Sequence, residues 1–392
     1  MGNLYLEEIK KLYEDQLLTA IVPFWIKNSL DKEYGGYMTW VDFDGSLLST
    51  DKAVWMQGRG LFIYSRLYNE FKKNEDWLSM AESGYKFLKN YCIDTDQRLF
   101  FRMTRDGKPI IKRRYVFSDV FAAAGFMEYY RATGVKEAYH LSLQCFKTVY
   151  DVFYGNLSLS PKTIGNTWNF KNHSLVMIMI DLCKTMRLAD TSYDYDKIIS
   201  DSIFQIKNHF YNQEKKCLLE NVGLHGEYEK DIPEGRLLNP GHAIETAWFI
   251  LDEALQKNSE KDISFALELF DNSLALGWDK KYGGIFAFLD SENKPPLNLE
   301  WDMKLWWPHN EALIASLLAY QATKDDKYLK IHKQLNDYCM KYFLDLENGE
   351  WYGYLHRDNT PSTSVKGCIW KGPFHVPRFY MYSLKIIENL LK

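Results

Sequence analysis

Several signatures of common functional classes are missing from this chain of 392 residues. Its six cysteines form no CxxC pair and show no metal-finger spacing, so we expect reduced thiols rather than a disulfide framework or a structural zinc site. The chain has no block of Lys and Arg, and its formal net charge is −4, which argues against nucleic-acid binding. It also lacks an apolar signal segment and any run of about 18 apolar residues. We therefore expect neither secretion nor a membrane span, and place the protein in the cytoplasm.

Motifs that bind phosphates, dinucleotides or catalytic metals are missing as well. No G-x-x-x-x-G-K-[ST] loop and no strand-borne G-x-G-x-x-G occurs. Histidines and acids do lie near one another in HAIE, from His242 to Glu245, and in HNE, from His309 to Glu311, but there is no H-E-x-x-H motif. The sequence thus predicts no catalytic metal and no cofactor required for the chemistry.

Aromatic side chains, by contrast, are abundant and make up 16% of the chain. Most of them fit helix packing, and the rest fit a large lined cavity, since stacked rings are one way in which proteins hold sugars. Strong 3.6-residue periodicity recurs along the chain, and Pro/Gly-rich segments are short, so no linker stands out. We predict a single domain over residues 1–392, with helices near residues 4–29, 53–72, 76–92, 117–133, 136–154, 172–188, 194–211, 241–257, 261–276, 304–323, 326–343 and 373–391.

One turn is written twice between these helices. Residues 31–40 read DKEYGGYMTW, and residues 279–288 read DKKYGGIFAF. Related hairpin-like stretches begin near residues 94, 212 and 348, and GNLSLSP, near Tyr154 to Pro161, is a degraded copy. The stretches recur about every 65 residues, which gives six units of two helices each.

Six such units predict a closed ring. A single unit cannot bury the apolar stripe of its helices, but six units joined in a ring can. The expected fold is therefore all-α, an (α/α)6 barrel of six helix pairs with short β-hairpin-like loops at one pole. The first helix of each unit is expected to be outer and the second inner, and the inner helices would start near residues 53, 117, 172, 241, 304 and 373.

Conspicuous polar residues stand at the starts of the predicted inner helices. Because these helices run parallel, their N-termini gather at one pole, where helix dipoles also favour developing negative charge. A lone histidine near a helix start is more often a packing or capping residue, but several in one register around a ring indicate a shared pocket. The candidates are Arg59, Ser118, Asp119, His173, His242, His309, Glu311 and His375.

The segments around these residues resemble those of a known family. DKAVWMQGR, RLLNPGHAIETAWFIL, KLWWPHNEALIA and KGPFHVPR, together with HSLVMIMIDL and FRMTRDGKP, are similar to the N-acylglucosamine 2-epimerase family, which is also known for the renin-binding protein. The likeness extends from about Phe24 to Arg378, and NPGHAIE and KGPFHVPR are its most specific parts. It implies an (α/α)6 barrel that interconverts N-acetylglucosamine and N-acetylmannosamine by inverting C2, with sialic acid breakdown as its setting.

The resemblance also implies roles for individual side chains. His242 and His375 match the two catalytic histidines of the family. Either Trp306 or its neighbour Trp307 is expected to form a stacking wall, and the other to belong to the core. The expected substrate-binding set, taken from the motif match and from the shared register, is Arg59, His173, Glu245, Trp306, His309 and Glu311.

Histidine suits the chemistry that this reaction requires. The C2 proton is acidic only when C1 is a carbonyl, so the sugar ring must open before the proton is removed to give an enediolate. Inversion then needs reprotonation from the opposite face, which two groups with an unperturbed pKa of about 6.5 can share as base and acid. Arg59 is expected to hold the C1 oxygen as charge develops, with an inter-helix ion pair as the structural alternative. Glu245 would either orient His242 or complement the helix dipole.

Other functions remain open on the sequence alone. An epimerase of mannose or cellobiose type, or an aldose–ketose isomerase, would use the same fold, and the isomerase would return the proton to C1. A glycoside hydrolase needs two carboxylates beside the glycosidic bond, which Glu245 and Glu311 could supply. A non-catalytic binding protein is a third class. The family also implies ATP as an activator rather than a reactant, and a homodimer, although no motif here points to either.

Overall fold

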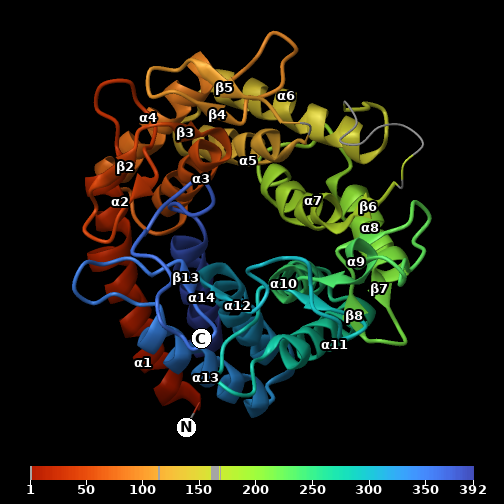
Figure 1. Cartoon of the computed structure of the whole chain (residues 1–392). Helices are drawn as coiled ribbons and strands as arrows, with labels where there is room; N and C mark the ends of the chain where they lie inside the picture. The colour runs from red at the N-terminus through yellow and green to blue at the C-terminus, as the bar shows by residue number, and fades with distance from the viewer. Residues whose placement is uncertain (1, 114, 160–166, 168) are drawn as a thin grey trace.

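Two concentric rings of helices surround a common centre in the computed structural model, which describes residues 2–113, 115–159, 167 and 169–392 (Figure 1). The inner ring consists of α3 (Val54–Glu70), α5 (Phe117–Thr133), α7 (His173–Met186), α10 (Pro240–Lys257), α12 (Trp306–Thr323) and α14 (His375–Leu391). The outer ring consists of α1 (Gly2–Asp15), η1 (Gln16–Ile21) and α2 (Val22–Ser29) in succession, α4 (Glu75–Tyr91), α6 (Lys136–Phe153), α8 (Tyr195–Gln205) with η2 (Ile206–Phe210), α11 (Glu260–Gly277) and α13 (Asp326–Tyr342). This confirms the (α/α)6 barrel, and each inner helix starts within two residues of its predicted position.

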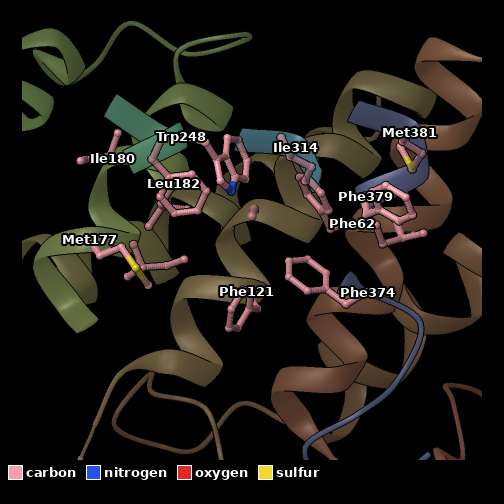
Figure 2. Close-up of a cluster of buried hydrophobic side chains, with 14 of the residues drawn as sticks. Phe62, Phe121, Met177, Ile180, Leu182, Trp248, Ile314, Phe374, Phe379 and Met381 are labelled. Atoms are coloured by element: carbon pink, nitrogen blue, oxygen red, sulfur yellow. The ribbon is translucent and has the colours of Figure 1, made fainter. Parts of the chain in front are cut away.

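The burial of each helix follows from its pattern of apolar residues. In the inner helix α12, every residue from Pro308 to Ala319 is buried, because neighbouring helices cover it on all sides. In the outer helix α13, the buried residues recur at spacings of three and four, as in Tyr328, His332, Leu335 and Cys339, so one face meets the inner ring and the other meets solvent. Figure 2 shows the cluster of buried apolar side chains to which all six inner helices contribute.

Two glycines bring the inner helices α3 and α5 unusually close together. A Cβ atom at Gly58 would lie 2.6 Å from the carbonyl carbon of Phe121, and one at Gly125 would lie 2.7 Å from the carbonyl oxygen of Gly58. Any larger residue at either position would force the helices apart. The close approach places Arg59, the residue after Gly58, against the ring of Phe121.

Short antiparallel strands join successive units at the pole where the inner helices begin. The strand before an inner helix pairs with the hairpin of the next unit, in β3–β4, β6–β9, β10–β11 and β12–β13. Val41 and Gly367 exchange two backbone hydrogen bonds and close the ring between the first and last units. The strands are β1 (Trp40–Val41), β2 (Leu47–Ser49), β3 (Lys52–Ala53), β4 (Arg102–Met103), β5 (Pro109–Ile111), β6 (Lys171–Asn172), β7 (Tyr211–Asn212), β8 (Cys217–Leu218), β9 (Asn221–Val222), β10 (Leu237–Leu238), β11 (Leu289–Asp290), β12 (Lys304–Leu305) and β13 (Tyr354–Leu355).

The repeated turn is an ion-pair clamp between units. Asp31 accepts hydrogen bonds from the backbone of its own turn, and its other oxygen is 2.8 Å from Lys52 Nζ, while Arg105 reaches it from the next unit. Asp279 repeats this arrangement with Lys304 at 2.8 Å and Arg357 at 3.2 Å. Burial opposes the charge of Asp279, but these partners lower its pKa to about 2. The duplicated sequence is therefore architectural.

Three predicted segments differ from the structure. The helix expected over residues 4–29 contains the π-helical turn η1, which ends two residues before Pro23, a residue with no N–H to donate to a regular turn. The helix expected over residues 194–211 ends in a second π-helical turn, η2, and then passes into β7. Of the expected degraded hairpin, residues 154–159 contain no strand, and residues 160 and 161 lie outside the described residues. Among the described helices, none combines the length and the apolar character that a membrane crossing needs.

Candidate active site

The first histidine–glutamate pair lies at the start of α10. Asn239 caps this helix by accepting a hydrogen bond from the His242 backbone N–H, which fixes the position of His242 on the rim. Its ring Nδ1 lies 3.0 Å from both carboxylate oxygens of Glu220, which follows β8. Burial alone would lower the pKa of His242, but the charge and hydrogen bond of Glu220, together with Glu245 and Glu311, raise it above its ordinary value.

The second pair lies at the start of α14. His375 Nδ1 is 2.9 Å from Glu311 Oε1, and the other oxygen of Glu311 accepts a hydrogen bond of 2.8 Å from the Trp248 indole. Arg378, one turn after His375, also reaches Glu311, at 2.7 Å, and donates to Glu245. Burial lowers the pKa of His375 well below its ordinary value, and the nearby charges of Arg378 and Arg59 lower it further.

Trp307 stands between the two pairs. The centre of its aromatic ring lies 5.1 Å from the ring centre of His242 and 5.8 Å from that of His375. Trp306 is buried, packs edge-on against Tyr354, and touches only His375 of the two histidines. Of the two tryptophans left open by the sequence, the structure thus places Trp307 beside both histidines and Trp306 mainly in the core.

Arg59 is a buried cation enclosed by aromatic rings. Its guanidinium carbon lies 4.5 Å from the ring centre of Trp55, 4.1 Å from Phe121 and 4.6 Å from Phe374. Burial, helped by the charge of Arg378, lowers the pKa of Arg59 to about 9. The described residues place no carboxylate within ion-pair distance of it, so the alternative of an inter-helix ion pair receives no support.

His173 joins the first pair from α7. Its Nδ1 lies 3.8 Å from Glu220, and its ring centre is 6.4 Å from that of His242. The ring is fully buried, and burial lowers its pKa to about 4. His173 is therefore neutral at physiological pH, and it lies fully buried beside the partly exposed ring of His242.

The structure does not bring His309, Ser118 or Asp119 to this group. His309 Nε2 accepts a hydrogen bond from the Ile285 N–H, its Nδ1 bonds to the Leu305 carbonyl, and its ring stacks on Tyr338 of the outer helix α13. Asp119 similarly accepts from the Leu99 N–H. The expectation that His309 binds substrate is corrected here, because both of its ring nitrogens hold the backbone of the preceding hairpin and helix start.

Three residues of the group were not assigned from the sequence: Glu220, Trp307 as the shared wall, and Arg378. Arg378 is the last residue of the KGPFHVPR motif, so its place on the same helix face as His375, three residues earlier, could have identified it. Trp307 precedes Glu311 by four residues and therefore shares its face. Glu220 lies in a loop, 22 residues before His242, and no spacing rule points to it.

Within the described part of the chain, two groups of three side chains have donor atoms spaced closely enough for a metal ion: His173, Glu220 and His242, and Glu245, Glu311 and His375. In the second group the guanidinium of Arg378 already lies between the carboxylates. A metal ion there would have to displace that cation.

Two histidines on different inner helices, each paired with a glutamate and both beside Trp307, together with the buried Arg59 and Arg378, define an (α/α)6 barrel of the carbohydrate epimerase and isomerase class. The sequence profile described as N-acylglucosamine 2-epimerase (GlcNAc 2-epimerase) matches residues 36–375. The chain belongs to this family.

Individual relatives agree with this assignment along the whole chain. An N-acylglucosamine 2-epimerase from Bos taurus is 33% identical over an alignment that covers 98% of this chain and 93% of the relative. A cellobiose 2-epimerase from Dictyoglomus turgidum is 28% identical over an alignment that covers 97% of this chain and 100% of the relative. The solved structure of cellobiose 2-epimerase from Bacillus thermoamylovorans superimposes with a TM-score of 0.84 at 25% identity. The match covers 98% of this chain and 100% of the solved chain.

Proposed function

We propose that this protein is an N-acylglucosamine 2-epimerase, which interconverts N-acetylglucosamine and N-acetylmannosamine by moving a proton at C2 of the ring-opened sugar. The observation that carries the proposal is that His242 and His375 approach Trp307 from separate helices, with pKa values shifted in opposite directions. The raised pKa of His242 favours its protonated, acid form, and the lowered pKa of His375 favours its neutral, base form. The similarity to N-acylglucosamine 2-epimerases supports this choice of substrate.

The hydrogen bonds of the two rings decide which nitrogen faces the sugar. His375 Nδ1 lies 2.9 Å from Glu311 Oε1 and 3.3 Å from Nη2 of Arg378. Because a carboxylate can only accept, we assign the Nδ1 hydrogen of His375 to the shorter contact, with Glu311. This leaves Nε2 of His375 with a lone pair, as a base requires. In its protonated form, His242 donates from Nδ1 to Glu220 and carries its second proton on Nε2, as an acid requires. His375 then removes the C2 proton, His242 returns one on the opposite face, and the reverse reaction exchanges these roles.

Arg59 is suited to stabilise the charge that forms on the C1 oxygen. Its guanidinium is held by three rings rather than by a carboxylate, so its charge is not already neutralised. A preorganised donor of this kind contributes roughly 3–4 kcal/mol to an oxyanion-type transition state. Trp307 supplies an apolar wall on which the open-chain sugar can lie.

The glycoside hydrolase alternative does not fit this arrangement. Such an enzyme needs one carboxylic acid free to protonate the leaving oxygen and one carboxylate free to act as nucleophile or base. Glu245 and Glu311 are both bonded to Arg378, and Glu311 also serves His375 and Trp248. Neither is available for that chemistry.

A proton NMR experiment in D2O tests the proposal. N-Acetylmannosamine incubated with the enzyme should give N-acetylglucosamine that carries deuterium at C2, while deuterium does not enter any other carbon. Parallel incubations with mannose and with cellobiose measure the free-sugar alternatives under identical conditions. Absence of both product and C2 deuterium from N-acetylmannosamine, with turnover of mannose or cellobiose, would overturn the choice of substrate.

Four further expectations stay predictions of the resemblance. Activation by ATP can be tested by turnover with and without the nucleotide, and a homodimer by sedimentation velocity. The cytoplasmic location and the setting in sialic acid breakdown need measurements in cells.

A further inference from the structure

The group behind His242 has an unusual arrangement of hydrogen bonds. Thr246 donates its hydroxyl hydrogen to the carbonyl of His242, at 2.7 Å. Its hydroxyl oxygen, 3.2 Å from Nε2 of His173, can therefore only accept a hydrogen from that nitrogen. The proton of neutral His173 is therefore on Nε2, and Nδ1 has a bare lone pair. This Nδ1 is fully buried, has no hydrogen-bond partner, and faces the Glu220 carboxylate at 3.8 Å.

A lone pair that points at a carboxylate is the donor arrangement of a cation site. The Nδ1 of His242, also directed at Glu220, adds a third donor, and all three ligand atoms lie within 4.8 Å of one another. Neighbouring donors around a tetrahedral ion with bonds of about 2.0–2.1 Å are separated by roughly 3.3 Å. The measured separations from Glu220, 3.0 Å to His242 and 3.8 Å to His173, lie on either side of that value.

The charges around this group also favour a cation. Glu220 is its only charged acid, and the more distant Glu245 and Glu311 add negative potential at His242. The other group with metal-like spacing differs in this respect, because Arg378 binds both of its carboxylates. The two groups thus have similar donors. In the first, an unpartnered buried lone pair faces the carboxylate, and in the second, the guanidinium of Arg378 already binds both carboxylates.

We propose that His173 Nδ1, Glu220 and His242 Nδ1 form a binding site for a divalent transition-metal ion of the Zn²⁺ type. Two imidazoles and one carboxylate are ligands that Zn²⁺ prefers, and the partly exposed ring of His242 leaves the fourth position open to the pocket. Binding replaces the hydrogen bond between His242 and Glu220 with bonds from both residues to the metal. The displaced Nδ1 proton of His242 passes to solvent, while its Nε2 keeps its hydrogen.

A bound ion would inhibit the reaction. His242 with a metal on Nδ1 can no longer alternate between acid and base, so turnover falls in proportion to metal occupancy. This consequence rests on the proposed function, whereas metal binding itself does not.

Metal binding is measured on the intact protein without substrate. Equilibrium dialysis against Zn²⁺ should give one tightly held ion per chain, and Co²⁺ should give the visible absorption bands of a four-coordinate nitrogen and oxygen site. His173→Gln and Glu220→Gln should each weaken Zn²⁺ binding by at least about tenfold. Glu311→Gln, the matched change in the second group, should leave the affinity within about twofold.

Three results would overturn the proposal. The wild-type chain could retain no Zn²⁺, or Glu311→Gln could lose as much Zn²⁺ affinity as His173→Gln and Glu220→Gln. The third is a cobalt spectrum dominated by the intense ultraviolet band of thiolate ligands. Circular dichroism and thermal unfolding of each variant show whether a lost affinity reflects a lost fold, and Glu220→Gln gives an independent reading if His173→Gln is unstable. An enzyme without epimerase activity that still binds Zn²⁺ through these ligands would separate the metal site from the proposed reaction.

Discussion

The two histidine–glutamate pairs have the same hydrogen bond and different surroundings. In both, a ring Nδ1 lies about 3 Å from a buried carboxylate, at 3.0 Å in the pair of His242 and Glu220 and at 2.9 Å in the pair of His375 and Glu311. Glu220 serves histidines only, whereas Glu311 also binds Arg378 and Trp248. Burial lowers the pKa of both histidines. Glu220 outweighs burial at His242, whereas at His375 the charges of Arg378 and Arg59 add to it, so one pKa rises and the other falls. Burial and the neighbouring charges together thus prepare an acid and a base from the same two residue types.

The same difference gives the two histidines opposite effects on stability. Both have a pKa of about 6.5 in the unfolded chain. The pKa of His242 is raised on folding, so its pairing stabilises the protein fully below about pH 6.5, and this contribution is lost as the pH rises through the folded-state pKa. The pKa of His375 is lowered, so its contribution is present above about pH 6.5 and is lost as the pH falls through the folded-state pKa.

Removing either histidine should have the largest effect. His375→Asn and His242→Asn should each lower kcat by about 10³-fold or more, since general acid and base catalysis contributes roughly 10²–10⁴-fold per group. The two variants should differ in D2O, because each retains one proton-transfer group. His242→Asn should still exchange the C2 hydrogen of one epimer, and His375→Asn that of the other, both without net epimerisation. Exchange of the same epimer by both variants would show that the histidines do not act on opposite faces.

Replacing Arg378 should reduce the difference between the pairs. Arg378→Met leaves Glu245 and Glu311 buried without their cation, and breaking a buried ion pair costs roughly 3–5 kcal/mol of unfolding free energy. It should also raise the pKa of His375, so the acidic limb of the kcat/KM profile moves to higher pH. Urea unfolding and a pH profile measure the two effects. Arg378→Lys keeps the charge, so its acidic limb should stay close to the wild-type pH. An acidic limb that does not move in Arg378→Met would show that Arg378 does not influence the pKa of His375.

Changing Glu220 tests whether this carboxylate raises the pKa of His242. Glu220→Gln removes the carboxylate that raises the pKa of His242, so the limb on which activity falls at high pH should move to lower pH. We expect kcat/KM at neutral pH to fall by about 10- to 100-fold, while KM changes little, because Glu220 acts through His242 rather than on the sugar. A pH profile of wild type and variant checks this, with Glu220→Asp as the conservative control. A lower kcat/KM with an unchanged basic limb would reduce Glu220 to a packing role.

The sequence predicted the ring and a set of polar candidates at one pole because both depend on spacing along the chain, and the family resemblance then singled out His242 and His375 among them. The 65-residue repeat specifies six helix pairs, and the shared register specifies the height of a residue along the barrel axis. The height of a residue along the barrel axis does not say whether its side chain faces the barrel interior or the outer helices. Residues two apart on a helix differ by about 200° around its axis, so when Glu311 faces the interior, His309 must face the outer helix, as it does.

Spacing along the chain could not predict the contacts between different units. Glu220 approaches His242 from a loop, and its position depends on how β9 pairs with β6 and how Leu219 bridges to Leu238. The ion pairs of Arg378 with Glu245 and Glu311 depend on the packing of three inner helices. No periodicity within one segment records such pairings, and these contacts are the ones that set the two pKa values apart.

A change in the repeat that leaves both pairs intact sets the baseline for these effects. Gly283 has a φ of +75°, and a Cβ atom there would meet no atom closer than 3.4 Å, so Gly283→Ala strains the backbone without a clash. The left-handed conformation costs a non-glycine residue roughly 1–2 kcal/mol, which urea unfolding can resolve. The kcat, the KM and both limbs of the pH profile should stay unchanged. Gly35→Ala, the equivalent change in the first copy, should match it, because its φ is +78° and its nearest contact is 3.5 Å. A shift of either limb in these variants would mean that the hairpins also influence the histidines, in addition to the burial and the charges around each ring.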